Sequence, residues 1–391
     1  MKKFLITISI VGMVLLLLGA GTFAVVFGLN GWDIRALDPE ELTPAYFVTD
    51  KQIDTVNLTG NWFFEIEEGE GFRIDYFTSS YSTVTVATSR TTGGYYTLNF
   101  VEERNVRFPS FGFAGIMRRT AGLYTVRITV TRDIALTVSG SGADVTIRDF
   151  SAGLNGVSLS GSSAALNLAD VDVAGNIALS GSNLWMNIEN VNVSGNISAT
   201  GSSMRAYLTD VKVSGNIRLG GSNLRATMTD VGIQDIVLEG SSIRFSATRL
   251  TAQNIRADGS NMEVTLLNSY VSRLLRAQGS SARITLRDSA VREVYIPRSS
   301  NVQVNAYNSH MHTLNASGSS VRAVLRIAGT IQDVSTVAVS GSNARIYLDG
   351  TRQGAALVRP GGEHAFMHFS LEGSSARIQL TMLGSDNRFA E

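Results

Sequence analysis

Residues 201–220 read GSSMRAYLTDVKVSGNIRLG, and residues 221–239 read GSNLRATMTDVGIQDIVLE. The two stretches align with one residue fewer in the second: each opens with Gly-Ser, and apolar residues then alternate with polar ones. Alternation with a period of two is typical of a β-strand that buries one face. A unit of about 20 residues cannot enclose a core, because ordering the chain costs more free energy than its few buried side chains return. The pattern therefore predicts units that stack on one another.

The same unit recurs along most of the chain. Gly-Ser followed by Ser or Asn begins at Gly161, Gly181, Gly201, Gly221, Gly240, Gly259, Gly279, Gly318, Gly341 and Gly373. The spacing is 19 or 20 residues up to Gly318, where Arg298-Ser299-Ser300 fills the one missing position, and then lengthens. This regularity predicts an all-β parallel β-helix, or β-solenoid, over residues 137–391, with about 20 residues per rung and each Gly-Ser stacked on its predecessor. The handedness stays open.

The N-terminal segment predicts a membrane anchor. Lys2 and Lys3 precede an uncharged stretch, Phe4–Leu29. At 1.5 Å per residue this stretch is long enough to cross a hydrocarbon core of about 30 Å. The lysines favour a cytoplasmic N-terminus, so residues 1–32 are predicted to be a cytoplasmic stub and one transmembrane helix. A signal peptide cleaved after the small residues 19–21 is the open alternative.

Two segments separate the anchor from the regular repeats. Residues 33–50 are polar and hold Pro39 and Pro44, which oppose a continuous helix, so we expect a stalk there. Residues 51–136 alternate in short stretches without a clean repeat and are rich in aromatic residues. They predict an irregular N-terminal β region that also caps the open edge of the solenoid.

Composition excludes several classes of function. The chain has 33 basic and 33 acidic residues, so it lacks the basic field of a general nucleic-acid binder. It has no cysteine, which excludes disulfides, thiolate metal sites and a cysteine nucleophile. Motifs for a serine nucleophile, a His-Glu-x-x-His zinc site or a phosphate-binding loop are absent from the sequence. We therefore predict a protein that is not an enzyme and needs no cofactor.

The layout resembles the bacterial "putative adhesin" family of membrane-anchored β-solenoid proteins, whose biochemical function is unknown. The resemblance covers the anchor, the early strands Ile53–Tyr76 and Tyr124–Val130, and the turn-rich repeats from Leu136 onward. Thr131-Arg132-Asp133 departs from it, since the family often has a proline there. The resemblance implies a single-pass protein of the bacterial cell membrane with its solenoid outside the cytoplasm, and it supplies no ligand.

Arginines recur at one outward position of the repeat. They are Arg205, Arg225, Arg244, Arg283, Arg322, Arg345 and Arg377. Glu263 interrupts the row, and Ala165 and Trp185 occupy it earlier. Residues at one register of a solenoid form a line, so the row predicts a basic stripe for an anionic wall polymer such as teichoic acid or an acidic polysaccharide. The alternative is a row of solvated arginines, partly neutralised by the aspartates of the following turn, Asp170, Asp210, Asp230 and Asp288.

Two further polar rows and the histidines have structural interpretations. Those aspartates share their register with Asn190 and Asn268 and are expected to be turn residues, with calcium binding as the alternative. A second row, at Asn176, Asn196, Asn216 and Asn254, predicts stacked amides in a turn. His310 and His312 flank Met311 and should share a face, and His364 and His368 lie further on; neither pair brings a full ligand set, so no metal site is predicted.

Together these features predict a non-enzymatic protein of the cell envelope. A rigid solenoid would display a repetitive surface for adhesion, or for binding a wall polymer, a glycan or an envelope protein. A β-helical carbohydrate-active enzyme and a structural or sensory scaffold are the alternatives. The oligomeric state stays open.

Overall fold

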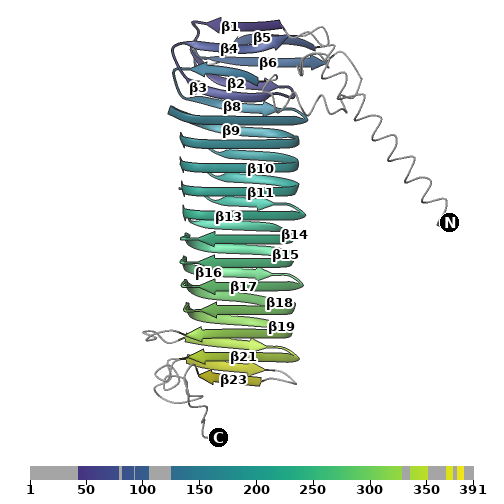
Figure 1. Ribbon diagram of the computed structural model, residues 1–391, viewed down its shortest axis with the longest axis vertical. Helices are drawn as coiled ribbons and strands as arrows, with labels where there is room; N and C mark the ends of the chain where they lie inside the picture. Colours follow the sequence, from purple (N-terminus) through teal and green to yellow (C-terminus); the bar gives the residue numbers. More distant parts are fainter. Residues whose placement is uncertain are drawn as a thin grey trace, which may run out of the picture.

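The computed structural model describes residues 43–78, 82–91, 93–104, 125–327, 335–350, 367–372 and 377–382. These residues form a long rod in which short strands stack from one end to the other (Figure 1). The predicted anchor Phe4–Leu29 lies outside the described residues. Within them, no helix has the length and apolar character needed to cross a bilayer.

Every regular element in the described part is a strand, and all of them join one sheet. The N-terminal strands are β1 (Thr43–Thr49), β2 (Ile53–Thr59), β3 (Phe63–Glu68), β4 (Phe72–Thr78), β5 (Ser82–Arg90), β6 (Tyr96–Arg104), β7 (Thr125–Val130) and β8 (Ile134–Ser139). The solenoid strands are β9 (Gly142–Val173), β10 (Ile177–Val193), β11 (Ile197–Val213), β12 (Ile217–Gly220), β13 (Asn223–Gly232), β14 (Asp235–Thr248), β15 (Thr251–Leu267), β16 (Tyr270–Gln278), β17 (Ser281–Arg287), β18 (Ala290–Tyr307), β19 (His310–Ile327), β20 (Ser335–Ser340), β21 (Asn343–Gly350), β22 (Met367–Glu372) and β23 (Arg377–Met382).

One rung shows how the sequence builds the core. In residues 197–216 the inward side chains, all under 5% exposed, are Ile197, Ala199, Met204, Ala206, Leu208, Val211 and Val213. They fall into three groups separated by the corners at Gly201, Asp210 and Gly215, so the rung has three sides. The rung thus buries seven apolar side chains. The first side, which begins at Ile197, contributes a second inward residue, Ala199, two positions before Gly201, because alternation continues to the corner.

The predicted stacking of the Gly-Ser corners is confirmed. Gly181 pairs in parallel register with Gly161 on one side and Gly201 on the other, and Gly240 pairs with Gly259. The rungs approach so closely here that a side chain cannot fit. A Cβ on Gly181 would lie 1.8 Å from the carbonyl oxygen of Gly161. Glycine is therefore required at Gly181 by contact between rungs, and an equally close contact recurs at most of the other Gly-Ser corners.

The missing Gly-Ser position is filled differently from the prediction. Ser299, rather than Arg298, pairs with Gly318, and the register shifts between Ile296 and Ser299. Arg298 has a φ of 52° and takes up the extra residue of this bulge. The solenoid thus keeps its rung spacing where the glycine is absent.

The row of aspartates and asparagines forms a corner of left-handed residues. Its members have φ between 48° and 55°: Asp149, Asp170, Asn190, Asp210, Asp230, Arg249, Asn268 and Asp288. Asp and Asn tolerate this conformation better than other residues with a side chain. The prediction that these Asp and Asn residues form turns is confirmed. Arg249 adopts the same left-handed conformation at this corner although it is neither Asp nor Asn.

The N-terminal part is interleaved rather than sequential. The rung formed by β2 and β3 lies between β6 and β7 on one side and β8 and β9 on the other. Along the sequence, residues 69–133 thus separate two rungs that pair directly in space, the β2–β3 rung and the rung that begins with β8. β1, β4 and β5 run antiparallel to their partners at the N-terminal end of the rod (Figure 1). β1 lies within the segment 33–50 that we expected to be a stalk.

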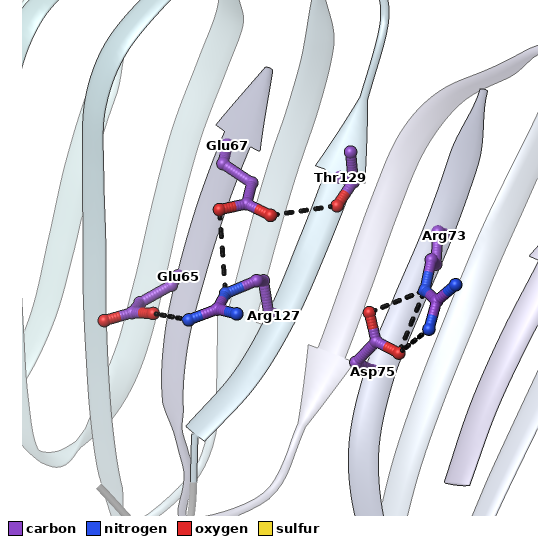
Figure 2. A network of polar contacts seen from close by, with 6 residues as sticks. All are labelled: Glu65, Glu67, Arg73, Asp75, Arg127 and Thr129. Carbon is purple, nitrogen blue, oxygen red and sulfur yellow. Dashed lines mark hydrogen bonds and ion pairs between the residues drawn. The ribbon is translucent and has the colours of Figure 1, made fainter. Parts of the chain in front are cut away.

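Exposed ion pairs link the insertion to β3 and also occur within it (Figure 2). Arg127 on β7 lies 3.5 Å from a carboxylate oxygen of Glu65 and 3.6 Å from one of Glu67, both on the adjacent β3. On β4, Arg73 and Asp75 pair two residues apart at 2.6 Å. Exposed pairs of this kind stabilise by about 0–1 kcal/mol each, so the buried residues carry most of the stability of this region.

Candidate ligand-binding groove

The predicted row of arginines is one continuous column, which we call the arginine column. Strand pairing places these residues in register from rung to rung: Ala165, Trp185, Arg205, Arg225, Arg244, Glu263, Arg283, Gln303, Arg322, Arg345 and Arg377. Gln303 is a second interruption that was not expected from the sequence. The backbones of Arg345 and Arg377 hold the register, and only their backbones are described.

An open groove of about 390 Å³ runs along this column. One wall consists of Arg205, Arg225, Arg244, Glu263 and Arg283. The other is the column two residues earlier, Ser203, Asn223, Ser242, Asn261 and Ser281. Both columns point outward because the residues between them point into the core. The groove crosses five rungs, or roughly 19 Å at about 4.8 Å per rung.

The groove carries a net positive charge. Arg244 is neutralised by Glu263 of the next rung, with a nitrogen–oxygen distance of 3.0 Å. Among the described residues, Arg205, Arg225 and Arg283 have no ion pair and no side-chain hydrogen bond. Neighbouring like charges at rung spacing repel by about 1 kcal/mol or less in water. The repulsion between unpaired arginines therefore gives no stabilisation, and the one exposed ion pair adds little.

A second set of arginines on the side before the Gly-Ser corner behaves differently. Arg218 lies 2.9 Å from Glu239, and Arg256 lies 2.5 Å from Asp258. Arg276 donates to the side-chain oxygen of Gln278. These arginines are held by partners on their own side of the solenoid, whereas most arginines of the groove face solvent alone.

The corner aspartates do not neutralise the groove, contrary to the alternative drawn from the sequence. Asp230 accepts two hydrogen bonds of 2.5 Å from Arg249, which itself lies at a corner. The hydrogen bond from Arg249 holds the pKa of Asp230 below its usual range. Asp170 accepts from Asn190 at 2.6 Å. These carboxylates thus contact other residues of the corner column and do not contact the arginines of the groove.

An exposed aromatic pair adjoins the end of the groove. Trp185 precedes Arg205 in the arginine column and is 44% exposed. Its ring lies 5.5 Å from that of Tyr207, centroid to centroid, at an interplanar angle of 41°. Trp185 had no role among the predictions from sequence. The signal was present, since tryptophan at an outward position of a strictly alternating strand fills no place in the core.

The remaining candidates are the row of asparagines and the histidines. The side-chain oxygen of Asn176 accepts from the backbone N–H of Asn196, and that of Asn196 accepts from Asn216, each at 2.8 Å. The predicted ladder is confirmed for Asn176, Asn196 and Asn216 and lies on the surface. Asn254 instead donates to the carboxylate of Asp235 at 2.6 Å. His310 and His312 lie on either side of the buried Met311, as expected. No group of three or more metal-ligating His, Asp or Glu occurs among the described residues, and His364 lies outside them.

No protein-family model and no curated protein matches the chain. Among solved structures it is similar to a "putative cell adhesion protein" from Clostridium sporogenes at 9% identity, covering 55% of this chain and 99% of that one, with a TM-score of 0.23. A "putative adhesin" from Parabacteroides merdae gives 12% identity, 88% and 97% coverage and a TM-score of 0.20. A "putative lipid binding protein" from Parabacteroides distasonis gives 13% identity, the same two coverages and a TM-score of 0.19. Values this low carry no argument about ligand or activity.

Proposed function

We propose that this chain is a non-enzymatic binding protein of the bacterial cell envelope whose groove holds an anionic polymer along the axis of the rod. The observation that carries the proposal is the stacking of Arg205, Arg225 and Arg283, without partners among the described residues, along an open groove. An arginine that served only to stabilise the surface would be expected to pair with a neighbour, as Arg218 and Arg256 do.

A polymer suits this groove better than a small anion. The charges lie in a line at rung spacing, and the groove is open rather than enclosed. Each exposed contact between an arginine and an anion is weak. Once a polymer has bound one arginine, however, its other anionic groups are held near the remaining arginines at a high effective concentration. Additive weak contacts are the usual basis of adhesion to a repetitive surface.

The lining of the groove favours binding over hydrolysis. Most glycoside hydrolases use two carboxylates on either side of the bond that is cleaved. In the described groove, Glu263 is the single carboxylate, and Arg244 pairs with it at 3.0 Å. The proposal therefore assigns the groove no catalytic residue.

The proposal includes the predicted location. With Phe4–Leu29 as an uncleaved anchor, the solenoid would stand outside the cytoplasmic membrane, where wall polymers lie. The protein should then stay with membranes after a carbonate wash, and protease added outside should degrade it beyond Asp33. Release of a soluble form that begins near Thr22 would show instead that the segment is a cleaved signal peptide.

The binding test uses the full chain in mild detergent. Biolayer interferometry against immobilised polygalacturonate and long-chain polyphosphate should detect binding that weakens as salt rises, because exposed charges are screened over about 10 Å at 0.1 M. Neutral dextran should not bind. The triple variant Arg205→Gln, Arg225→Gln, Arg283→Gln should weaken binding by about tenfold or more, since 1.4 kcal/mol corresponds to a factor of ten.

The matched control removes the same charge elsewhere. The triple variant Arg218→Gln, Arg256→Gln, Arg276→Gln should bind like the parent, and both triple variants should melt within a few degrees of it. Equal loss of binding in the two variants would indicate attraction to overall charge and overturn the groove. Absence of binding by the parent to either polyanion would overturn the proposed function.

A further inference from the structure

The aromatic pair lies on the same line as the charges of the groove. Trp185 pairs in register with Arg205, and Arg205 pairs with Arg225. A ligand that follows the arginine column therefore meets the indole ring one rung beyond Arg205. Tyr207 belongs to the same rung as Arg205 and contacts the indole from the side.

This pair is built as an exposed platform. Trp185 is 44% exposed although the positions on either side of it, Leu184 and Met186, are buried. Its contact with Tyr207 fixes the ring against the rod, since aromatic pairs at such distances attract by about 0.5–1.5 kcal/mol beyond area burial. A ring held in this way loses little conformational entropy when a ligand covers it.

The wall opposite the arginines adds hydrogen-bonding groups. Ser203, Asn223, Ser242, Asn261 and Ser281 alternate hydroxyls and amides along the groove. Among the described residues, none of these side chains has a hydrogen bond. Hydroxyls and amides both donate and accept, so this wall can bind neutral hydroxyl groups, which a polyphosphate chain lacks.

From these three features we infer that the ligand of the groove is an acidic polysaccharide, with carboxylates facing the arginines, hydroxyls facing the Ser/Asn wall and one sugar ring stacked on Trp185 and Tyr207. The inference rests on the proposed function and narrows it to carbohydrate. The rungs lie about 4.8 Å apart, a spacing of the same order as the length of one sugar residue, so a chain that lies along the groove can bring some of its carboxylates to Arg205, Arg225 and Arg283. The nonpolar face of a pyranose ring matches an indole in size and in its C–H groups.

The test compares two polyanions on the full chain. Trp185→Ala should weaken binding to polygalacturonate by up to about tenfold, as the loss of one aromatic contact predicts. Binding to polyphosphate should change by less than about twofold on the same scale. Tyr270→Ala is the control, because Tyr270 is 53% exposed and lies outside both walls of the groove.

Tryptophan fluorescence distinguishes direct stacking of a sugar on Trp185 from an indirect effect of its substitution on binding. Binding of galacturonate oligomers should change the tryptophan fluorescence of the parent, and Trp185→Phe should abolish the change while it keeps part of the affinity. Trp62 is 1% exposed and should not respond.

The outcomes distinguish the two proposals. If Trp185→Ala affects both polyanions equally, or neither, while the groove triple variant loses both, the carbohydrate platform is wrong and the anionic-polymer function stands. Tighter binding of single-stranded DNA than of polygalacturonate would also overturn the platform, because bases stack on aromatic rings as well. If the parent binds no polyanion, both proposals fail.

Discussion

Replacing Gly240 by alanine tests whether contact between rungs dictates the glycine repeat. A Cβ at this position would lie 1.9 Å from the carbonyl oxygen of Gly221, and real contacts of this kind stay beyond 3.0 Å. The obstacle is backbone, so no side-chain rotation can relieve it. The two rungs must separate at this corner.

The cost follows from the hydrogen bonds on either side of the contact. Gly221 donates its N–H to Glu239 at 2.9 Å, and Ser242 donates to Ser222 at 2.8 Å. Separation of the rungs by the required amount breaks both bonds. At 0.5–1.5 kcal/mol for each bond, we expect a local loss of about 1–3 kcal/mol.

Hydrogen exchange is the suitable assay, because a solenoid can open rung by rung and a single melting temperature would average over the rod. The amides of Gly221 and Ser242 should exchange about five- to a hundredfold faster in Gly240→Ala, at 1.4 kcal/mol per factor of ten. Gly232→Ala is the control: a methyl group there would meet no atom within 4 Å and the φ of Gly232 is ordinary, so the change should be neutral or stabilise by up to about 1 kcal/mol. Unchanged exchange in Gly240→Ala, or equal effects at both glycines, would refute the reasoning.

Three further predictions concern the corners and the insertion. Asp210→Val should destabilise the protein by about 1–2 kcal/mol in urea unfolding because its φ is 53°, whereas Asp210→Gly should be tolerated; equal effects would refute the left-handed corner. Asn196→Ala should speed hydrogen exchange of the backbone N–H of Asn216, which donates to the side-chain oxygen of Asn196 at 2.8 Å. Unchanged exchange would count against the asparagine ladder. The hydroxyl and N–H of Ser151 hold the pKa of Glu68 below its usual range. This contact therefore favours folding above the pKa of the unfolded state and is lost as the pH falls through the lowered value. In an NMR titration Ser151→Ala should raise the pKa of Glu68, and an unchanged value would show that the hydroxyl does not act.

The regular part of the fold was predictable because each rung repeats the same constraints. Alternation places Met204 and Ala206 inside and Arg205 outside, and the constant spacing brings Arg205 beside Arg225. The position of the arginine column follows from these two periods alone. The first side of a rung is too short to show a period on its own, as in residues 177–179, where Ile177 and Leu179 are inward.

The features that the sequence did not predict depend on contacts between residues at different positions of the repeat, or between segments far apart in the sequence. The insertion of residues 69–133 requires β2 to pair with β8 across a long stretch of chain. The choice of Arg249 rather than an arginine of the groove as partner of Asp230 is decided by geometry at a corner. The meeting of Trp185 with Tyr207 is a diagonal contact between rungs, whereas the sequence pattern aligns only residues at the same register.

The interleaved rung at the N-terminal end also decides how the rod resists force. β2 is hydrogen-bonded on both edges by strands that follow it in the chain, β6 and β8. A pull on the chain ahead of β1 can strip β1 from β4, but the release of β2 then requires two hydrogen-bond ladders to break, one on each of its edges. A pull on the last strands can peel one rung at a time. For a rod held at its N-terminal end and loaded along its side, β2 would therefore resist longer than the last strands, and damage would begin at the far tip.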